Sequence, residues 1–502
     1  MKRAFYSVLF FFVFILSSMQ GIAQVTPPRE LHQFSRATSY AELSLYVKQL
    51  DESSDLLTVE TTGQSVEGRN LYALYYSENG FGKDPSKIKV LIFAQQHGNE
   101  QSGKEGALWL ASELLQPENR YLFSKIDLVL VPQVNPDGSE VNKRRNGNNM
   151  DLNRNHLILT EPETETLHRL FNRYLFDVTL DVHEYYPYDS VWQSLGFRKN
   201  TEVTVGGMTN INISSKLRKF SRKKALPYLI NYVSGKGFSS FEYLPGGPPE
   251  ENYLRRSTFD INDGRQSFGI QNTLSFIQEG RNGTDSYMEN LEKRAMGQAA
   301  GIRGFLEFTC QNAKKIKKMV KLERFKLLHP KYGQPVSVQM IHAASGEILQ
   351  LPVYSYKSMA DSTILVKNFR PVVKTLADVE KPYGYLIPED LPQLKEWSQR
   401  HQLEMYPFEF SRDYVLEQYH IQAIDSIDFE LDIIINPNVD NRTFELEPLS
   451  PSYLFIPTAQ LKGNMIVTAL EPKSMLGLAT YKEFEFLIRP DTAYPILRVE
   501  KK

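Results

Sequence analysis

Strand-length apolar runs alternate with helix-like segments along the first part of this chain, and this alternation constrains the fold more than any other feature. The runs are short and rich in β-branched residues, whereas the helix-like segments have the wider apolar spacing of a helix with one buried face. The runs lie at Lys89–Ala94, Ile126–Val131, Val178–Val182 and Leu274–Ile277, and the helix-like segments at Gly106–Leu115, Thr164–Leu175 and Tyr287–Phe308. This order predicts an α/β fold with a mostly parallel or mixed twisted sheet flanked by helices.

Further helices and strands are expected before and after these alternating segments. Before the alternation, a helix is expected at Tyr40–Leu50 and strands at Leu57–Thr61 and Asn70–Tyr76. Because 502 residues exceed the roughly 250–300 that one core usually organises, we expect an α/β domain over residues 24–318 and a β-rich domain over residues 319–502. The second domain is predicted from one helix, Leu391–His401, among strands at Val336–Ile341, Ile348–Tyr354, Ser362–Val366, Phe429–Ile435, Tyr453–Ile456 and Met465–Leu470.

Residues 1–23 have the composition of a secretory signal peptide. Lys2 and Arg3 precede the apolar run Phe5–Leu16, and the small residues Gly21 and Ala23 follow it. The run is shorter than the ~20 residues that span a bilayer, which favours cleavage after Ala23 over a membrane anchor. We therefore expect an exported protein, periplasmic or secreted, with no stable membrane insertion after cleavage.

Charge and cysteine content exclude other classes of protein. The formal net charge is -1, and the short cluster Lys314–Lys318 is the longest basic block that stands out. A nucleic-acid partner is therefore not expected. Cys310 is the only cysteine, so an internal disulfide is impossible and the core must stabilise the fold. Cys310 itself is expected to be a small buried hydrophobic residue.

Two histidines and a glutamate follow predicted strands. His97 and Glu100 come directly after the run Lys89–Ala94, and His183 ends the run Val178–Val182. Ligands of open α/β sheets gather at the carboxyl ends of the strands. Catalytic zinc typically takes three protein ligands and leaves one position to water. A His-x-x-Glu spacing alone is weak evidence, but the second strand-end histidine makes these residues candidate ligands of one metal ion.

A long polar loop is predicted after the strand Ile126–Val131. It begins with the turn-forming pairs of Asn135–Gly138 and continues through Arg144 and Arg145 to Asp151–Asn155. Long ordered loops in compact domains are usually functional. Arginine suits a carboxylate ligand, and a cation can stabilise an oxyanion. The alternative is a solvated basic loop with ordinary turns.

Glu279 closes the predicted strand Leu274–Ile277. A buried carboxylate is costly unless it is paired or functional. Beside a metal, such a group could take a proton from water and deliver it to a leaving amine. Glu279 is therefore a candidate general base and acid.

Taken in order, these motifs resemble those of the zinc metallocarboxypeptidase family, the pancreatic-carboxypeptidase-like peptidases. The likeness covers about residues 35–310, and it includes Gly68-Arg69 in the strand-and-turn sequence upstream of the first motif. The segment Tyr453–Ser474 is similar to the tail of secreted bacterial members with a C-terminal β-rich module. The family's ordered motifs fall on His97 and Glu100, Asn135–Gly138, Arg144, Asn153 and Arg154, His183 and Glu279.

The resemblance implies a zinc metallopeptidase, a hydrolase of the carboxypeptidase type. It implies one Zn²⁺ per chain and a peptide substrate with a free C-terminal carboxylate. The roles it implies are metal binding by His97, Glu100 and His183, proton transfer by Glu279, oxyanion stabilisation by Arg144, and substrate binding at the terminal carboxylate by Asn153 and Arg154.

Some assignments stay open at this point. Arg145 could replace Arg144, although the spacing back from Asp151 favours Arg144. The family uses a mobile tyrosine upstream of the late glutamate, for which Tyr243 and Tyr253 are candidates.

For each of three further charged residues, the sequence allows two roles. Glu184 either supports the neighbouring metal ligand or is a surface charge. Arg265 and Arg281 could select acidic substrate side chains or serve as structural ion-pair partners, and we do not include them among the expected site residues.

Two other kinds of function are compatible with parts of this pattern. The same metal site could belong to a murein-peptide amidase or an N-acyl amino-acid deacylase. A non-catalytic peptide- or glycan-binding protein is the third possibility. It should lack a metal ligand or the late glutamate, and this chain keeps both.

Overall fold

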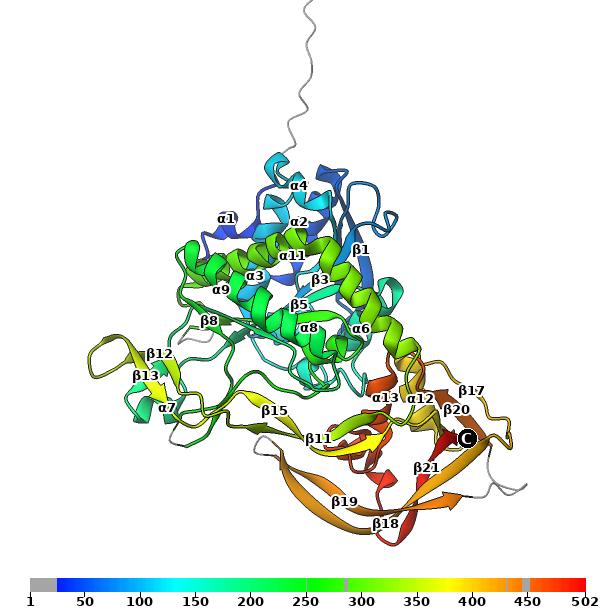
Figure 1. Cartoon of the computed structure of the whole chain (residues 1–502). Coiled ribbons are helices and arrows are strands. Elements are labelled where there is room, and N and C mark those ends of the chain that lie inside the picture. The colour runs from blue at the N-terminus through cyan, green and yellow to red at the C-terminus, as the bar shows by residue number, and fades with distance from the viewer. Residues whose placement is uncertain (1–24, 250, 284–287, 430–431, 445–451) are drawn as a thin grey trace, which may run out of the picture.

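The computed structural model describes residues 25–249, 251–283, 288–429, 432–444 and 452–502 (Figure 1). The expected signal peptide, residues 1–23, lies outside these ranges. Within them, no helix combines the length and the apolar character that crossing a bilayer requires.

An eight-stranded mixed sheet forms the centre of the described structure. The expected α/β fold with a mixed sheet flanked by helices is thus confirmed. Four neighbouring strands at its centre run parallel, in the spatial order β4 (Ile126–Val131), β3 (Ile88–Ala94), β5 (Val178–Tyr185) and β10 (Leu274–Arg281). The sheet is extended on the β4 side by β2 (Asn70–Tyr76) and β1 (Leu57–Gln64), and on the β10 side by β7 (Val203–Gly207) and β8 (Ser240–Glu242).

Both faces of the central strands are buried, which explains why apolar residues occur on both faces of runs such as residues 90–94 and 128–131. Successive side chains of β3 alternate between two hydrophobic clusters: Val90 and Ile92 belong to the larger one, Leu91 and Phe93 to the smaller one. The larger cluster is covered by α3 (Gln101–Glu113) and α11 (Leu291–Leu328), and the smaller one by α6 (Pro162–Tyr174). The long helix α11 crosses the whole α/β part in Figure 1.

Local sequence signals set the start of the first long helix. α2 (Tyr40–Ser53) begins after Ser39, whose hydroxyl accepts a hydrogen bond from the backbone N–H of Glu42. The Glu42 carboxylate in turn accepts one from the backbone N–H of Ser39 at 2.9 Å. This reciprocal pair is a capping box, and it explains why the helix begins at Tyr40, as expected.

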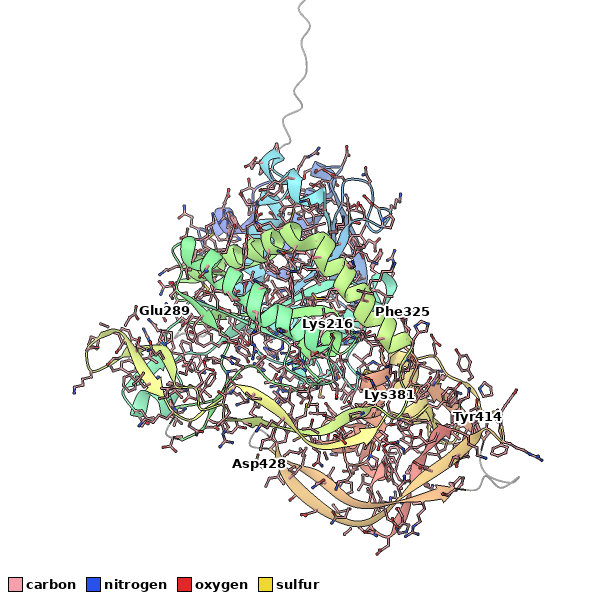
Figure 2. The ribbon with its side chains drawn as sticks, viewed as in Figure 1. Lys216, Glu289, Phe325, Lys381, Tyr414 and Asp428 are labelled. Carbon is pink, nitrogen blue, oxygen red and sulfur yellow. The ribbon has the colours of Figure 1, made fainter. Side chains whose placement is uncertain are left out.

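The C-terminal part is rich in strands, also as expected. β11 (Pro335–Ala343) pairs with β15 (Val372–Glu380), and β12 (Leu349–Ser355) with β13 (Ala360–Val366). Figure 2 labels Tyr414 and Asp428, which lie near opposite ends of the long strand β18 (Tyr414–Phe429). This strand belongs to a six-stranded sheet with the spatial order β17 (Tyr406–Pro407), β20 (Tyr453–Pro457), β16 (Gly384–Pro388), β21 (Thr492–Lys501), β18 (Tyr414–Phe429) and β19 (Asp432–Phe444).

Two of the strand predictions for this part were wrong. The run Met465–Leu470 lies in a helix, α13 (Gly463–Leu470), and all of its residues are buried. Short apolar runs that are buried on every side have no periodicity that separates helix from strand. The run Phe429–Ile435 is divided between two strands, because Phe429 ends β18 and Asp432 begins β19.

The C-terminal part packs directly on the α/β part. β12 pairs with β6 (Phe197–Lys199), and β14 (Phe369–Arg370) pairs with β9 (Leu254–Arg255). Helix α11 runs through position 318, so the division into residues 24–318 and 319–502 stays a prediction. The helix α12 (Pro392–Arg400) makes a third contact with the α/β part, through Trp397.

Trp397 of α12 is fully buried, and its indole N–H donates a hydrogen bond to the backbone oxygen of Leu157 at 2.8 Å. Leu157 belongs to the α/β part, where it is buried in the larger cluster. Truncating a buried tryptophan removes both packing and this hydrogen bond, and the cavity that remains cannot fully collapse.

We predict that Trp397→Ala lowers the free energy of unfolding of the whole chain by about 3–5 kcal/mol. Equilibrium unfolding in urea measures this value. Gln399→Ala, at an exposed position of the same helix, is the matched control and should change it by less than about 0.5 kcal/mol. Equal stability of the two variants would show that the contact between the two parts contributes nothing.

Candidate active site

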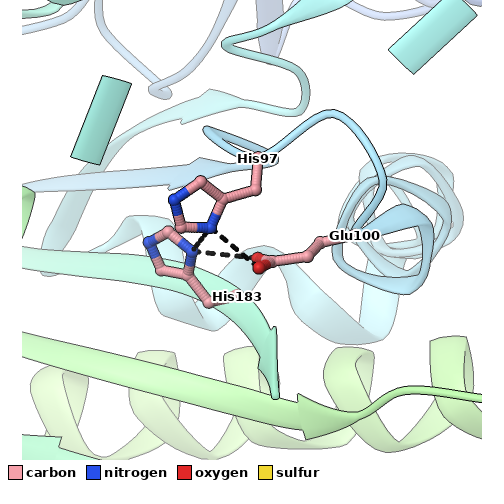
Figure 3. Close-up of side chains that lie close together, drawn as sticks. All are labelled: His97, Glu100 and His183. Carbon is pink, nitrogen blue, oxygen red and sulfur yellow. Dashed lines mark hydrogen bonds and ion pairs between the residues drawn. The ribbon is translucent and has the colours of Figure 1, made fainter. Parts of the chain in front are cut away.

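Three of the predicted ligands meet at the carboxyl ends of β3 and β5 (Figure 3). His97 lies just after β3, Glu100 directly precedes α3, and His183 lies in β5. One ligand atom from each lies within 4.8 Å of the others. The Glu100 carboxylate oxygens lie 2.8 Å from Nδ1 of His97 and 3.0 Å from Nδ1 of His183.

The turn that carries His97 and Glu100 is held by the turn Asn135–Gly138. A Cβ atom at Gly98 would lie 2.1 Å from the carbonyl carbon of Gly138, so the two backbones approach each other in a way that only glycine permits. The side chain of Asn135 donates to the backbone oxygen of Gln96 at 3.0 Å, and its amide oxygen accepts from the backbone N–H of Gly138 at 2.8 Å. The Asn-Pro-Asp-Gly motif therefore positions the ligand turn and does not itself face the metal site.

A carboxylate lies behind each histidine. Nε2 of His97 is 3.0 Å from Oδ1 of Asp151, and Nε2 of His183 is 2.8 Å from Oδ1 of Asp181. With a proton on each Nε2, the histidines donate to these aspartates and present the lone pairs of Nδ1 to a metal. The two Nδ1 atoms are only 3.2 Å apart, which favours a cation between them and Glu100.

The charges of this cluster also fit a divalent cation. Although burial favours the neutral imidazole, the carboxylates of Asp181 and Glu100 raise the pKa of His183 well above its usual value. Burial likewise opposes ionisation of Glu100, but His97 and His183 hold its pKa well below its usual range. Two imidazole nitrogens and one carboxylate form a donor set that suits zinc with a free position for water.

Of the two neighbouring arginines, Arg144 faces the cluster. Its Nε donates to Oδ2 of Asp151 at 3.0 Å, and its Nη1 lies 3.6 Å from Oε1 of Glu100. Its side chain is 44% exposed, so part of the guanidinium remains available to a ligand. Arg145 instead donates to the backbone oxygen of Asn149 at 3.0 Å on the surface.

Asn153 and Arg154 line the same cavity. The Asn153 amide oxygen accepts from the backbone N–H of Gly264 at 2.9 Å and from Nε2 of Gln96 at 3.2 Å, which fixes the orientation of this side chain. Arg154 donates from Nη1 to the backbone oxygen of Asn153 at 2.8 Å. Both residues face the space next to the metal ligands.

Glu279 lies in β10, in register with His183 of the neighbouring strand β5. Its side chain is 8% exposed and lines the cavity. Burial raises the pKa of Glu279 to about 8, while the nearby His183 acts in the opposite direction. A cation held by the three ligands would also lower this pKa, and so favour the carboxylate that can accept a proton.

The predicted residues surround one cavity of about 330 Å³. Six of them are in its wall, and His183 lies behind it with 1% of its side chain exposed. The wall also contains Leu351 and Pro352 of β12, so the C-terminal part contributes to the site. The residues in the wall are His97, Glu100, Arg144, Asn153, Arg154 and Glu279.

Sequence reasoning missed several supporting residues. Asp181 precedes His183 by two positions in one strand, and side chains at this spacing share a face, so this residue could have been found. No sequence signal pairs Asp151 with His97, because a loop brings them together. The pairing of β12 with β6 likewise has no local signal, so the place of Leu351 in the wall could not be foreseen.

The structure gives positions for the residues whose roles the sequence left open. Glu184 is buried and paired with Arg294 at 2.7 Å, so it is not a surface charge. Tyr243 lines the cavity, whereas Tyr253 lines a neighbouring one. Arg281 donates to the backbone oxygen of Asn200 at 3.2 Å, outside the cavity wall.

Known proteins resemble this chain over its α/β part and beyond. Residues 44–243 match the family model described as zinc carboxypeptidase. Carboxypeptidase 2 of Trichophyton tonsurans is 22% identical over 491 residues, which cover 91% of this chain and 85% of that protein. Human carboxypeptidase D is 24% identical over 327 residues, which cover 58% of this chain and 23% of that protein.

Solved structures were found with low overall similarity. A metallo-carboxypeptidase from Pseudomonas aeruginosa is 20% identical, with a TM-score of 0.42 over 56% of this chain and 70% of that chain. Carboxypeptidase A from Helicoverpa armigera is 19% identical, with a TM-score of 0.43 over 56% of this chain and 75% of that chain. The zinc-carboxypeptidase match over residues 44–243, the carboxypeptidase relatives and the His-Glu-His cluster agree, and together they support a zinc metallopeptidase, a hydrolase of the metallocarboxypeptidase family.

Proposed function

We propose that this protein is a zinc-dependent carboxypeptidase that hydrolyses the peptide bond next to a free C-terminus. The observation that supports this most is that the metal ligands, a buried glutamate and two arginines share one cavity. A substrate that ends in that cavity can meet a metal, a proton acceptor and a cation at the same time.

One zinc ion per chain would be held by Nδ1 of His97, the carboxylate of Glu100 and Nδ1 of His183. Zinc bound there supplies a Lewis acid, which polarises a carbonyl and lowers the pKa of water towards ~7. Asp151 and Asp181 keep the histidines in the orientation and protonation state that this requires.

Glu279 moves the proton. Its carboxylate takes a proton from the attacking water and later gives that proton to the nitrogen of the departing amino acid. The buried position next to His183 keeps the group close to the reacting atoms and raises its affinity for a proton. Burial raises the pKa of Glu279 and a bound cation lowers it, and these opposing effects suit a glutamate that both accepts and donates a proton near neutral pH.

The two arginines have different tasks in this proposal. Arg144, beside Glu100, stabilises the oxyanion that forms on the scissile carbonyl. Asn153 and Arg154 bind the terminal carboxylate of the substrate, since a guanidinium and an amide can both donate to it. A carboxylate bound there limits cleavage to the last peptide bond of the chain.

Export to the periplasm or out of the cell is also part of this proposal. It depends on the signal-like composition of residues 1–23. The N-terminal sequence of the protein recovered from its native host should begin at Gln24, and recovery with Met1 from the cytoplasm would contradict export.

We predict that Glu279→Gln lowers kcat about 100- to 10,000-fold, because it removes the proton acceptor. The variant should retain about one zinc per chain by elemental analysis, since a metal ligand is not changed. His97→Ala is the paired variant, and it should lose zinc. Near-normal activity of Glu279→Gln would refute its role, and full zinc occupancy of His97→Ala would refute the ligand set.

We predict that Arg154→Ala lowers kcat/KM about 10- to 100-fold for peptides with a free C-terminus, because a charge-assisted hydrogen bond is lost. The discrimination against C-terminally amidated peptides should shrink by the same factor. Arg145→Ala is the control, because this exposed arginine lies outside the cavity. Equal losses on acid and amide substrates would contradict the proposed binding of the carboxylate.

The same assay distinguishes the proposed function from the alternatives in which this metal site acts on other substrates. Release of acyl groups from N-acyl amino acids, or of residues from murein peptides, without release of C-terminal amino acids from ordinary peptides would favour the amidase or deacylase alternative.

A further inference from the structure

Arg265 is a buried cation whose hydrogen-bonding groups are only partly used. It lies in α10 (Gly264–Gly269) and is 1% exposed. Its Nη2 donates to Oγ1 of Thr258 at 2.6 Å and to Oδ2 of Asp263 at 2.5 Å. Its Nε and Nη1 are buried and have no acceptor among the residues that the structure describes. Three of the five N–H donors of this guanidinium are therefore unsatisfied.

Asp263 bonds only Nη2 of this guanidinium and does not satisfy Nε or Nη1. Its Oδ1 accepts from the backbone N–H of Gln266, as the N-cap of α10, and its Oδ2 accepts from both Thr258 and Arg265. The aspartate thus holds one edge of the guanidinium in place and leaves the rest without a partner.

Arg265 is one of the side chains that line the active-site cavity. Arg265 lines the same cavity as His97, Glu100 and Glu279, together with Tyr243, whose ring centre lies 5.8 Å from the guanidinium carbon. Buried N–H donors without acceptors are rare in native proteins, and at a cavity wall they indicate a missing ligand. A ligand for a guanidinium is an anion with oxygen acceptors.

Lys199 is a further cation in the wall of this cavity. Nζ of Lys199 donates to the backbone oxygens of Leu244 at 2.9 Å and Gly246 at 3.1 Å. No carboxylate of the described ranges lies within ion-pair distance of it. Burial lowers the pKa of Lys199 to about 8, so the ammonium form still predominates at pH 7.

The carboxylates around this part of the wall are already paired. Glu242 forms an ion pair with Arg256 at 3.1 Å, and Glu184 forms one with Arg294. Asp263 is likewise paired with Arg265. The cations Arg154 and Lys199 therefore leave positive charge in the wall beside Glu279 that is unpaired among the described residues. Such charge repels a lysine or arginine side chain and attracts an acidic one.

We propose that Arg265 binds the side-chain carboxylate of the substrate's C-terminal residue, so that the enzyme selects glutamate or aspartate at this position. This inference rests on the proposed carboxypeptidase function and specifies its substrate class. The apolar neighbours Ile277 and Leu351 contact the methylene groups of the same side chain, and Lys199 adds to the positive potential. Arg265 is thus a specificity-determining residue, separate from Arg154, which binds the terminal carboxylate.

The test uses the zinc-loaded full chain and peptides that differ only in their last residue: glutamate, glutamine, leucine or lysine. Glutamate and glutamine have the same shape, so the ratio of their kcat/KM values isolates the charge. We expect a ratio of at least about 100 in favour of glutamate, because a site built to bond a group rejects analogues that lack it. Arg265→Met should reduce the ratio to within about threefold of 1.

Arg281→Met is the matched control, because Arg281 also lies near Glu279 in the chain but outside the cavity wall. It should leave the glutamate-to-glutamine ratio unchanged. A wild-type enzyme that releases glutamine or leucine as fast as glutamate would overturn the proposal. So would an unchanged ratio in Arg265→Met, or loss of the ratio in Lys199→Met alone.

Thermal unfolding and zinc content must show that Arg265→Met is folded. If it is not, Arg265→Lys serves instead, since it keeps the charge but loses the planar fork. This variant should reduce the ratio at least about tenfold, and an unchanged ratio would overturn the proposal.

A binding measurement separates failure of this proposal from failure of the carboxypeptidase function. Calorimetry with Glu279→Gln should show at least about tenfold tighter binding of free L-glutamate than of L-glutamine. If the wild-type protein cleaves none of the peptides, the proposed function fails, and this ratio still decides the role of Arg265. Equal binding of the two amino acids would refute that role.

Discussion

The parallel pairing of β3, β5 and β10 is the constraint on which the active site depends. Parallel strands end at the same edge of a sheet, so the residues at and after their carboxyl ends come together. The register pairs His183 directly with Glu279, and Ala94, three residues before His97, with Val182. A slip of one residue in any of these strands would turn its functional side chain towards the opposite face. The burial of both sheet faces prevents such a slip.

The same burial explains what could be predicted from the sequence. The expected strands Asn70–Tyr76 and Ile126–Val131 agree with the structure at both ends, because these strands inside the core are mostly apolar and lie between polar turns. The helix α13 was expected as a strand, since its residues are buried all round and no polar face marks the helical period. The metal ligands could be found because they lie in the last residues of a strand or shortly after its end. Supporting residues such as Asp151 could not, because only the folded loop brings them to the site.

The C-terminal part shows a further limit of local reasoning. Its strand β12 pairs with β6 through contacts such as Val353 with Lys199. This pairing brings Leu351 and Pro352 to the wall of the active-site cavity. Nothing in the sequence of either strand specifies its partner. The consequence is functional, since the part of the chain that has no metal ligand nevertheless helps to shape the space for the substrate.

In the proposed carboxypeptidase, the charges along the cavity orient the peptide before any bond is broken. Glu100 is one of the metal ligands, and Asp151 and Asp181 each lie behind one of the two histidines, so three carboxylates surround the metal position. Arg154 and Arg265 are positively charged, and both line the cavity. A C-terminal acidic residue has two carboxylates within one amino acid, and the cavity wall offers two guanidinium groups. With Arg154 on the terminal carboxylate and Arg265 on the side chain, as proposed, the peptide binds in one direction, with its last peptide bond beside Glu279.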